Sequence, residues 1–82
     1  MEQPEIVLDV RQTVPMFRHP LIFTAFNLLR PGMTLELVND HDPAPLRYQL
    51  VFEHQGEFEW AYAEQGPDVW RVAIRRVALP AS

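Results

Sequence analysis

The sequence contains no cysteine and no lysine, and only three of its 82 residues are glycine. The lack of cysteine excludes disulfides, thiolate metal sites and thiol redox chemistry. A domain of this length buries only about 60% of the surface that its unfolded chain exposes, so its apolar core must supply most of its stability. Hydrophobic residues make up 48% of the chain, which is typical of a packed domain and argues against disorder.

The charge balance argues against several classes of partner. All seven basic residues are arginine, and the net charge at pH 7 is −4. Surfaces that bind nucleic acid normally carry clustered lysine and arginine, and membrane spans need an apolar run of roughly 18–20 residues, which this sequence lacks. Residues 1–5 are acidic and polar, unlike the basic start of a signal peptide. We therefore expect a cytoplasmic, bacterial-type protein that binds neither nucleic acid nor membrane.

Four stretches alternate between apolar and polar residues, as strands with one buried face do. These stretches are 5–11, 33–38, 58–62 and 70–75. We assign 12–18 to a loop and predict that a helix begins at His19-Pro20, because proline suits the first helical position, and ends near Pro31. Residues 46–55 fit a strand or a helix; we predict a helix, which Asp42 would cap and Gly56 would end.

The resulting order predicts an α+β fold in a single domain, residues 1–82, with its core at about 5–79. This is a two-layer βαβαββ sandwich, with two helices on one face of a mixed four-stranded sheet. In the first helix we expect Ile22, Phe26 and Leu29 to form the buried ridge, with Leu21, Ala25 and Leu28 beside it. In the final hairpin, we expect Trp60 opposite Trp70 and Glu59 opposite Arg71, with both tryptophans on the apolar face. The other face of the sheet should be solvated and carry Asp9, Arg11, Thr34, Glu36, Glu57, Glu59, Arg71 and Arg75.

The predicted topology brings polar residues to one edge of the sheet. The loops after the first two strands leave from the carboxyl ends of parallel strands, where ligands of open sheets bind, and the turn at 65–67 should lie there too. Three interpretations stay open for this edge: an anion site at helix N-termini, a divalent metal site using His19 and His41, or ordinary turns and caps. His54 is expected at the opposite edge as a surface residue. The candidate residues of the functional edge are Arg18, His19, Asn39, Asp40, His41 and Asp42.

Several segments together resemble a known family. They are Leu8-Asp9-Val10-Arg11, Arg18-His19-Pro20-Leu21-Ile22-Phe23, Pro31-Gly32, Val38-Asn39-Asp40-His41-Asp42-Pro43 and Gly66-Pro67. They resemble the bacterial family called domain of unknown function 2249, which is similar in layout to the TusA/SirA-like sulfur-carrier fold. That resemblance implies the same βαβαββ sandwich, and an association with hemerythrin-like iron domains and with nitrogen-oxide respiration. The sulfur carriers place a cysteine before the proline that opens their first helix. Here that pair is His19-Pro20, and an imidazole cannot carry a persulfide.

We therefore predict a small binding or interaction module rather than an enzyme, acting with a hemerythrin-like or redox metalloprotein. The alternative is a protein that binds a metal or a small anion through His19 and His41, with weak catalytic activity. Its cofactor would then be a divalent metal. Homodimerisation through a sheet edge is compatible with either function.

Overall fold

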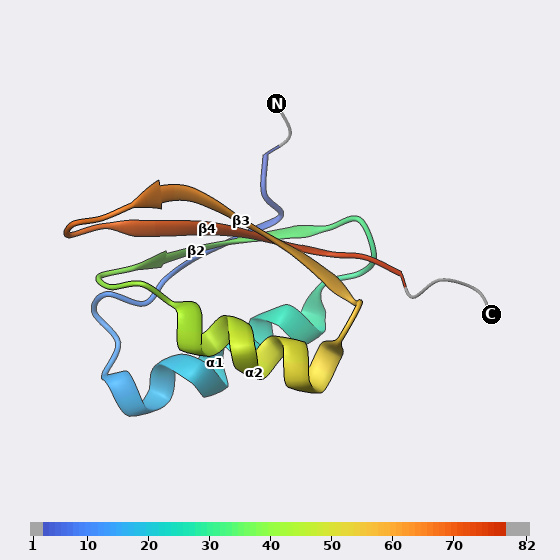
Figure 1. Ribbon diagram of the computed structural model, residues 1–82, viewed down its shortest axis with the longest axis horizontal. Coiled ribbons are helices and arrows are strands. Elements are labelled where there is room, and N and C mark those ends of the chain that lie inside the picture. The colour runs from blue at the N-terminus through green and yellow to red at the C-terminus, as the bar shows by residue number, and fades with distance from the viewer. Residues whose placement is uncertain (1–2, 79–82) are drawn as a thin grey trace.

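The computed structural model describes residues 3–78, and its elements follow the predicted order. Strands β1 (Ile6–Asp9), β2 (Thr34–Asn39), β3 (Phe58–Gln65) and β4 (Trp70–Arg76) form one sheet in the order β1-β2-β4-β3. Helices α1 (Pro15–Leu28) and α2 (Ala44–His54) both lie on one face of that sheet (Figure 1). The predicted two-layer α+β sandwich is confirmed. The predicted core boundary at residue 79 lies outside the described residues.

The sheet is mixed, and its strand directions place three carboxyl ends together. β1 pairs with β2 in parallel, with Leu8 opposite Leu37. β4 is antiparallel to both β2 and β3, so β3 runs in the same direction as β1 and β2. The loop after β1, the loop after β2 and the turn after β3 therefore leave from the same edge, as the sequence predicts.

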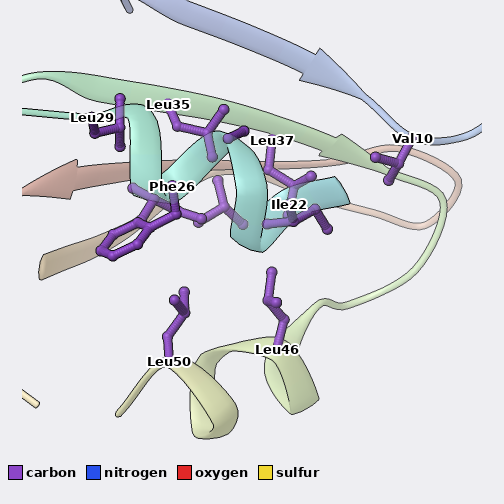
Figure 2. Close-up of a cluster of buried hydrophobic side chains, with 11 residues drawn as sticks. Val10, Ile22, Phe26, Leu29, Leu35, Leu37, Leu46 and Leu50 are labelled. Atoms are coloured by element: carbon purple, nitrogen blue, oxygen red, sulfur yellow. The ribbon is translucent and has the colours of Figure 1, made fainter. Parts of the chain in front are cut away.

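The apolar faces of the strands and helices meet in one core. Alternate residues of β2 and β4 are fully buried, among them Leu35 and Leu37. Phe26 of α1 lies against them, and α2 contributes Leu46 and Leu50 from below (Figure 2). The helix predicted for residues 46–55 is confirmed, because Leu46 and Leu50 face the core at helical spacing.

Helix α1 begins at Pro15, so the predicted loop over residues 12–18 is wrong in its second half. The sequence offers two prolines for the first helical position, and the helix uses the earlier one. Pro20 lies inside the helix and has no N–H to offer the carbonyl of Met16. That loss is tolerated because Met16 lies in a solvent-exposed turn, where water can satisfy the carbonyl.

The predicted apolar ridge of α1 is confirmed, because Ile22, Phe26 and Leu29 are buried. Of the residues predicted beside it, Ala25 is buried, but Leu21 and Leu28 are exposed. The latter two project from the flank of α1 rather than into the core, because successive helical residues are about 100° apart.

The predicted register of the hairpin is wrong. Trp60 lies opposite Ile74 and Glu59 opposite Arg75, while Trp70 pairs with Gln65. The pairing is shifted because the chain reverses over 66–69, where the Gly66 N–H donates to the carbonyl of Val69 at 2.9 Å. Gly66 has φ +67°, and a Cβ there would lie 2.9 Å from the Trp70 ring, so the turn requires glycine.

The tryptophans follow the predicted apolar face, since Trp60 packs against the core and Trp70 covers the turn. On the opposite face, Arg75 pairs with Glu59 at 2.9 Å. The prediction that Glu57 lies on that face is wrong. Its carboxylate lies 3.3 Å from His54, the last residue of α2, and 3.7 Å from Arg76, the last residue of β4.

Neither helix within residues 3–78 is long and apolar enough to cross a membrane.

Candidate functional site

Arg18 lies under the predicted edge rather than on it. It stands in the first turns of α1, and only 8% of its surface is exposed. Its Nε donates to the carbonyl of Thr13 at 2.8 Å, and its Nη2 donates to the carbonyl of Arg11 at 3.3 Å. These bonds fix the connection between β1 and α1 against the helix.

The same guanidinium also holds the end of β2. Nη1 of Arg18 donates to Asn39 Oδ1 and to Asp40 Oδ1, both at 2.9 Å, and Nη2 donates to Asp40 Oδ2 at 3.2 Å. The backbone N–H of Asp40 donates to Asn39 Oδ1 at 2.8 Å, so this buried amide oxygen has two donors. Because each nitrogen of Arg18 is engaged inside the protein, its role is to brace the loop rather than to bind an external anion.

His41 is the exposed end of this network. Its Nδ1 lies 2.7 Å from Asp40 Oδ1, and 65% of its side chain is exposed. Arg18 and then His41 hold the pKa of the Asp40 carboxyl at about 2 through their hydrogen bonds to it. A carboxylate on Nδ1 orients the imidazole and leaves Nε2 on the outer side of the ring, an arrangement also found where histidines bind metals.

Asp42 joins the loop after β2 to the hairpin. Its Oδ1 accepts a hydrogen bond from the Tyr62 hydroxyl at 2.7 Å and another from the backbone N–H of Ala44 at 3.1 Å. The predicted cap by Asp42 is wrong, because Pro43 is the N-cap of α2 and no side chain caps it, while Asp42 holds the N–H of Ala44, the first residue of the helix. The bond to Asp42 raises the pKa of the Tyr62 phenol.

His19 has a different neighbourhood from His41. Its Nδ1 lies 3.1 Å from Gln49 Oε1 of α2, and the Gln49 amide donates to Glu53 at 3.1 Å. These side chains line an open groove of about 640 Å³ between the two helices, together with Pro20, Phe23, Asn27 and His54.

The sequence did not predict this groove. His54 is half-buried, with its ring 5.0 Å from that of Phe26 and its Nδ1 3.3 Å from Glu57. The signal that could have located the groove is the spacing of His19, Phe23 and Asn27, which puts them on one face of α1.

The candidate residues therefore form two groups. Arg18, Asn39, Asp40 and His41 are joined by direct hydrogen bonds, and Asp42 continues the same loop. His19 instead bonds to α2. Among residues 3–78 no group of three or more histidine, aspartate or glutamate side chains is arranged to hold a metal ion.

The fold and this edge define a small α+β domain with a braced acidic loop beside an exposed histidine. The chain belongs to the family described as "Uncharacterized conserved protein (DUF2249)", whose profile matches residues 7–76. No curated protein and no solved structure matches the chain.

Proposed function

We propose that this protein is a small protein-binding module whose contact surface is the loop between β2 and α2, residues 40–43. The observation that carries this proposal is the geometry of His41. Its imidazole is 65% exposed, yet it is fixed through Asp40 to the buried Arg18. A side chain oriented before binding loses less conformational entropy when a partner covers it, so such a group favours specific recognition.

The charges of the loop define the partner's chemistry. Asp40 and Asp42 flank His41, and the guanidinium of Arg18 lies buried beneath Asp40. The loop therefore offers carboxylate and imidazole groups to a basic patch or to a metal with an open coordination position. The family resemblance supports a hemerythrin-like or redox metalloprotein as this partner. A cytoplasmic location belongs to the same proposal.

Direct binding tests the proposal. The probes are the purified hemerythrin-like proteins of the source organism, titrated by calorimetry with the wild-type chain and with His41→Ala and Asp42→Asn. We expect His41→Ala to weaken binding at least about tenfold, as expected for a central contact. Glu59→Gln is the matched control, because Glu59 is an exposed carboxylate on the opposite face of the sheet. Equal affinity of the wild type and His41→Ala, or no binding to any of these proteins, would overturn the proposal.

The second candidate function is binding of a divalent metal or a small anion through His41 and His19. It is favoured by the Asp40–His41 pair, since a carboxylate on Nδ1 raises the basicity of the metal-binding nitrogen. Titration with Zn²⁺ and Co²⁺ tests it, with His41→Ala and His19→Ala measured separately. Stoichiometric binding that is lost in either variant would support this function, and the absence of binding in the wild type would refute it.

A further inference from the structure

Strand β1 lies at one edge of the sheet, and one of its two hydrogen-bonding edges has no partner strand among the described residues. Within the described residues, β2 is its single strand partner. The Val10 N–H donates to the carbonyl of Val38 at 3.0 Å, and alternate residues of a parallel strand point their polar groups the same way. The N–H and C=O groups of Ile6 and Leu8 therefore face β2, and those of Val7 and Asp9 face the free edge, where a further strand can pair with them.

An apolar helix flank lies beside this edge. Helix α1 packs on β1 and β2, and its His19 and Phe23 face α2 across the groove. Phe17, Leu21 and Leu28 lie on the opposite flank at positions i, i+4 and i+11, and they are 57%, 40% and 68% exposed. With the sheet below and α2 on one side, this flank points outward past β1.

The other edge of the sheet is less suited to pairing. β3 has an irregularity between Tyr62 and Glu64 that interrupts its ladder. It also carries Glu59 and Glu64 without a basic residue, so two copies of β3 would bring like charges together. Bulges and charges of one sign are the devices by which natural sheets protect their edges.

We propose that two copies of this chain associate through antiparallel pairing of β1 with β1, which would extend the sheet across a two-fold axis. Neighbouring strands lie about 4.8 Å apart, so an α1 centred over β1 and β2 would be one such spacing from the axis. The two copies of α1 would then be about 10 Å apart and antiparallel, which is a normal distance for packed helices. Their apolar flanks, Phe17, Leu21 and Leu28, would cover each other.

Side-chain alternation and charge select one register. Opposed residues must point to the same face of the sheet, so the pairing can be centred on Val7 or on Leu8, but not between them. Centred on Val7, the pairing sets Glu5 of one copy against Asp9 of the other, which is unfavourable. Centred on Leu8, it sets Val7 against Asp9, so the two residues of each strand whose backbone groups face outward pair with each other, while Glu5 lies opposite the turn that follows β1. We therefore assign the register centred on Leu8.

Sedimentation velocity of the whole chain tests the association. We expect a dimer of twice the 9.6 kDa chain mass for the wild type and a monomer for Leu21→Lys, which would place two cations near the axis. Phe52→Lys is the matched control, because Phe52 is 89% exposed on α2, away from β1. This variant should remain a dimer. Circular dichroism checks that both variants fold. A monomeric wild type, or dissociation by Phe52→Lys rather than by Leu21→Lys, would overturn the proposal.

Engineered cysteines test the register, since the natural chain contains none. Val7→Cys and Asp9→Cys would oppose each other in a hydrogen-bonded pair with Cα atoms about 5.5 Å apart, within the range that disulfides bridge. A mixture of the two single variants should form a disulfide-linked dimer on mild oxidation, while neither variant alone does so. Cross-linking of Val7→Cys alone would show the other register, and no cross-link in the mixture would refute pairing through β1.

Discussion

Arg18 in α1 donates to both carboxylate oxygens of Asp40, which follows β2, at 2.9 and 3.2 Å. The two residues are 22 positions apart in the sequence, and the pair closes the β1–α1–β2 unit at the edge where the loops meet. Because a guanidinium is planar and has five donors, it can bind a carboxylate through two nitrogens while its remaining N–H groups reach backbone carbonyls. The exposed loop thus depends on a cation that solvent scarcely reaches.

Removal of this cation should destabilise the fold. Arg18→Ala would leave Asn39 Oδ1 and the carbonyl of Thr13 without a charged donor in a poorly solvated region. We expect a loss of about 2–3 kcal/mol in the free energy of unfolding, measured by urea denaturation. Arg18→Lys should recover only part of this loss, because an ammonium cannot bind the carboxylate through two nitrogens. A midpoint for Arg18→Ala equal to that of the wild type would contradict the bracing role.

The low pKa of Asp40 predicts acid sensitivity. The pKa falls from 3.8 to about 2 in the folded protein, chiefly through the hydrogen bond from Arg18. The folded state therefore binds fewer protons than the unfolded state between these values, and this contribution to stability is present above pH 4 and lost as the pH falls toward 2.

Urea denaturation at several pH values tests this behaviour with Asp40→Asn. The difference in midpoint between the wild type and Asp40→Asn should be constant above about pH 4 and should shrink as the pH approaches 2. Asp68→Asn, in the turn after β3, is the control for a carboxylate without the Arg18 contact. A difference that stays the same from pH 5 to pH 2 would exclude linkage through Asp40.

Much of the fold could be predicted because its signals are local. Leu35 and Leu37 alternate with polar residues as a half-buried strand requires, and Leu46 and Leu50 have helical spacing. The start of α1 and the hairpin register could not be fixed in the same way. Pro15 and Pro20 are both acceptable first residues of a helix, and the start at Pro15 includes the buried Arg18 in the helix.

The candidate site was predictable in its location but not in its contacts. Strand direction alone brings residues 39–42 to the edge where α1 begins. Sequence spacing could not show that Arg18 turns inward to Asp40, or that the ring of His19 meets Gln49. These outcomes depend on rotamers and on the distance between the helices, which are set by core packing.

The core should respond to truncation very differently from the helix surface. Phe26 is fully buried, with its ring 6.2 Å from Phe58 in an edge-to-face arrangement and the Arg76 guanidinium 4.8 Å from its centre. We expect Phe26→Ala to cost about 3–5 kcal/mol, a large share of the total stability of a small domain. Phe52→Ala removes the same ring from an 89% exposed position and should change the urea midpoint very little. Similar effects of the two variants would show that α1 does not pack as described.

The bond between Tyr62 and Asp42 predicts a shifted phenol titration. The Asp42 carboxylate accepts a hydrogen bond from the Tyr62 hydroxyl, with the two oxygens 2.7 Å apart, and this raises the pKa of Tyr62 above 10.0 because the bond favours the neutral phenol. The chain has two tyrosines, so a Tyr48→Phe background leaves Tyr62 as the single phenol whose absorbance changes on ionisation. In that background Asp42→Asn should lower the titration midpoint. Since the folded pKa is raised, the bond stabilises the fold below pH 10 and ceases to do so as the pH rises through the folded pKa. An unchanged midpoint in Asp42→Asn would mean that the loop after β2 is not held to the hairpin by this bond.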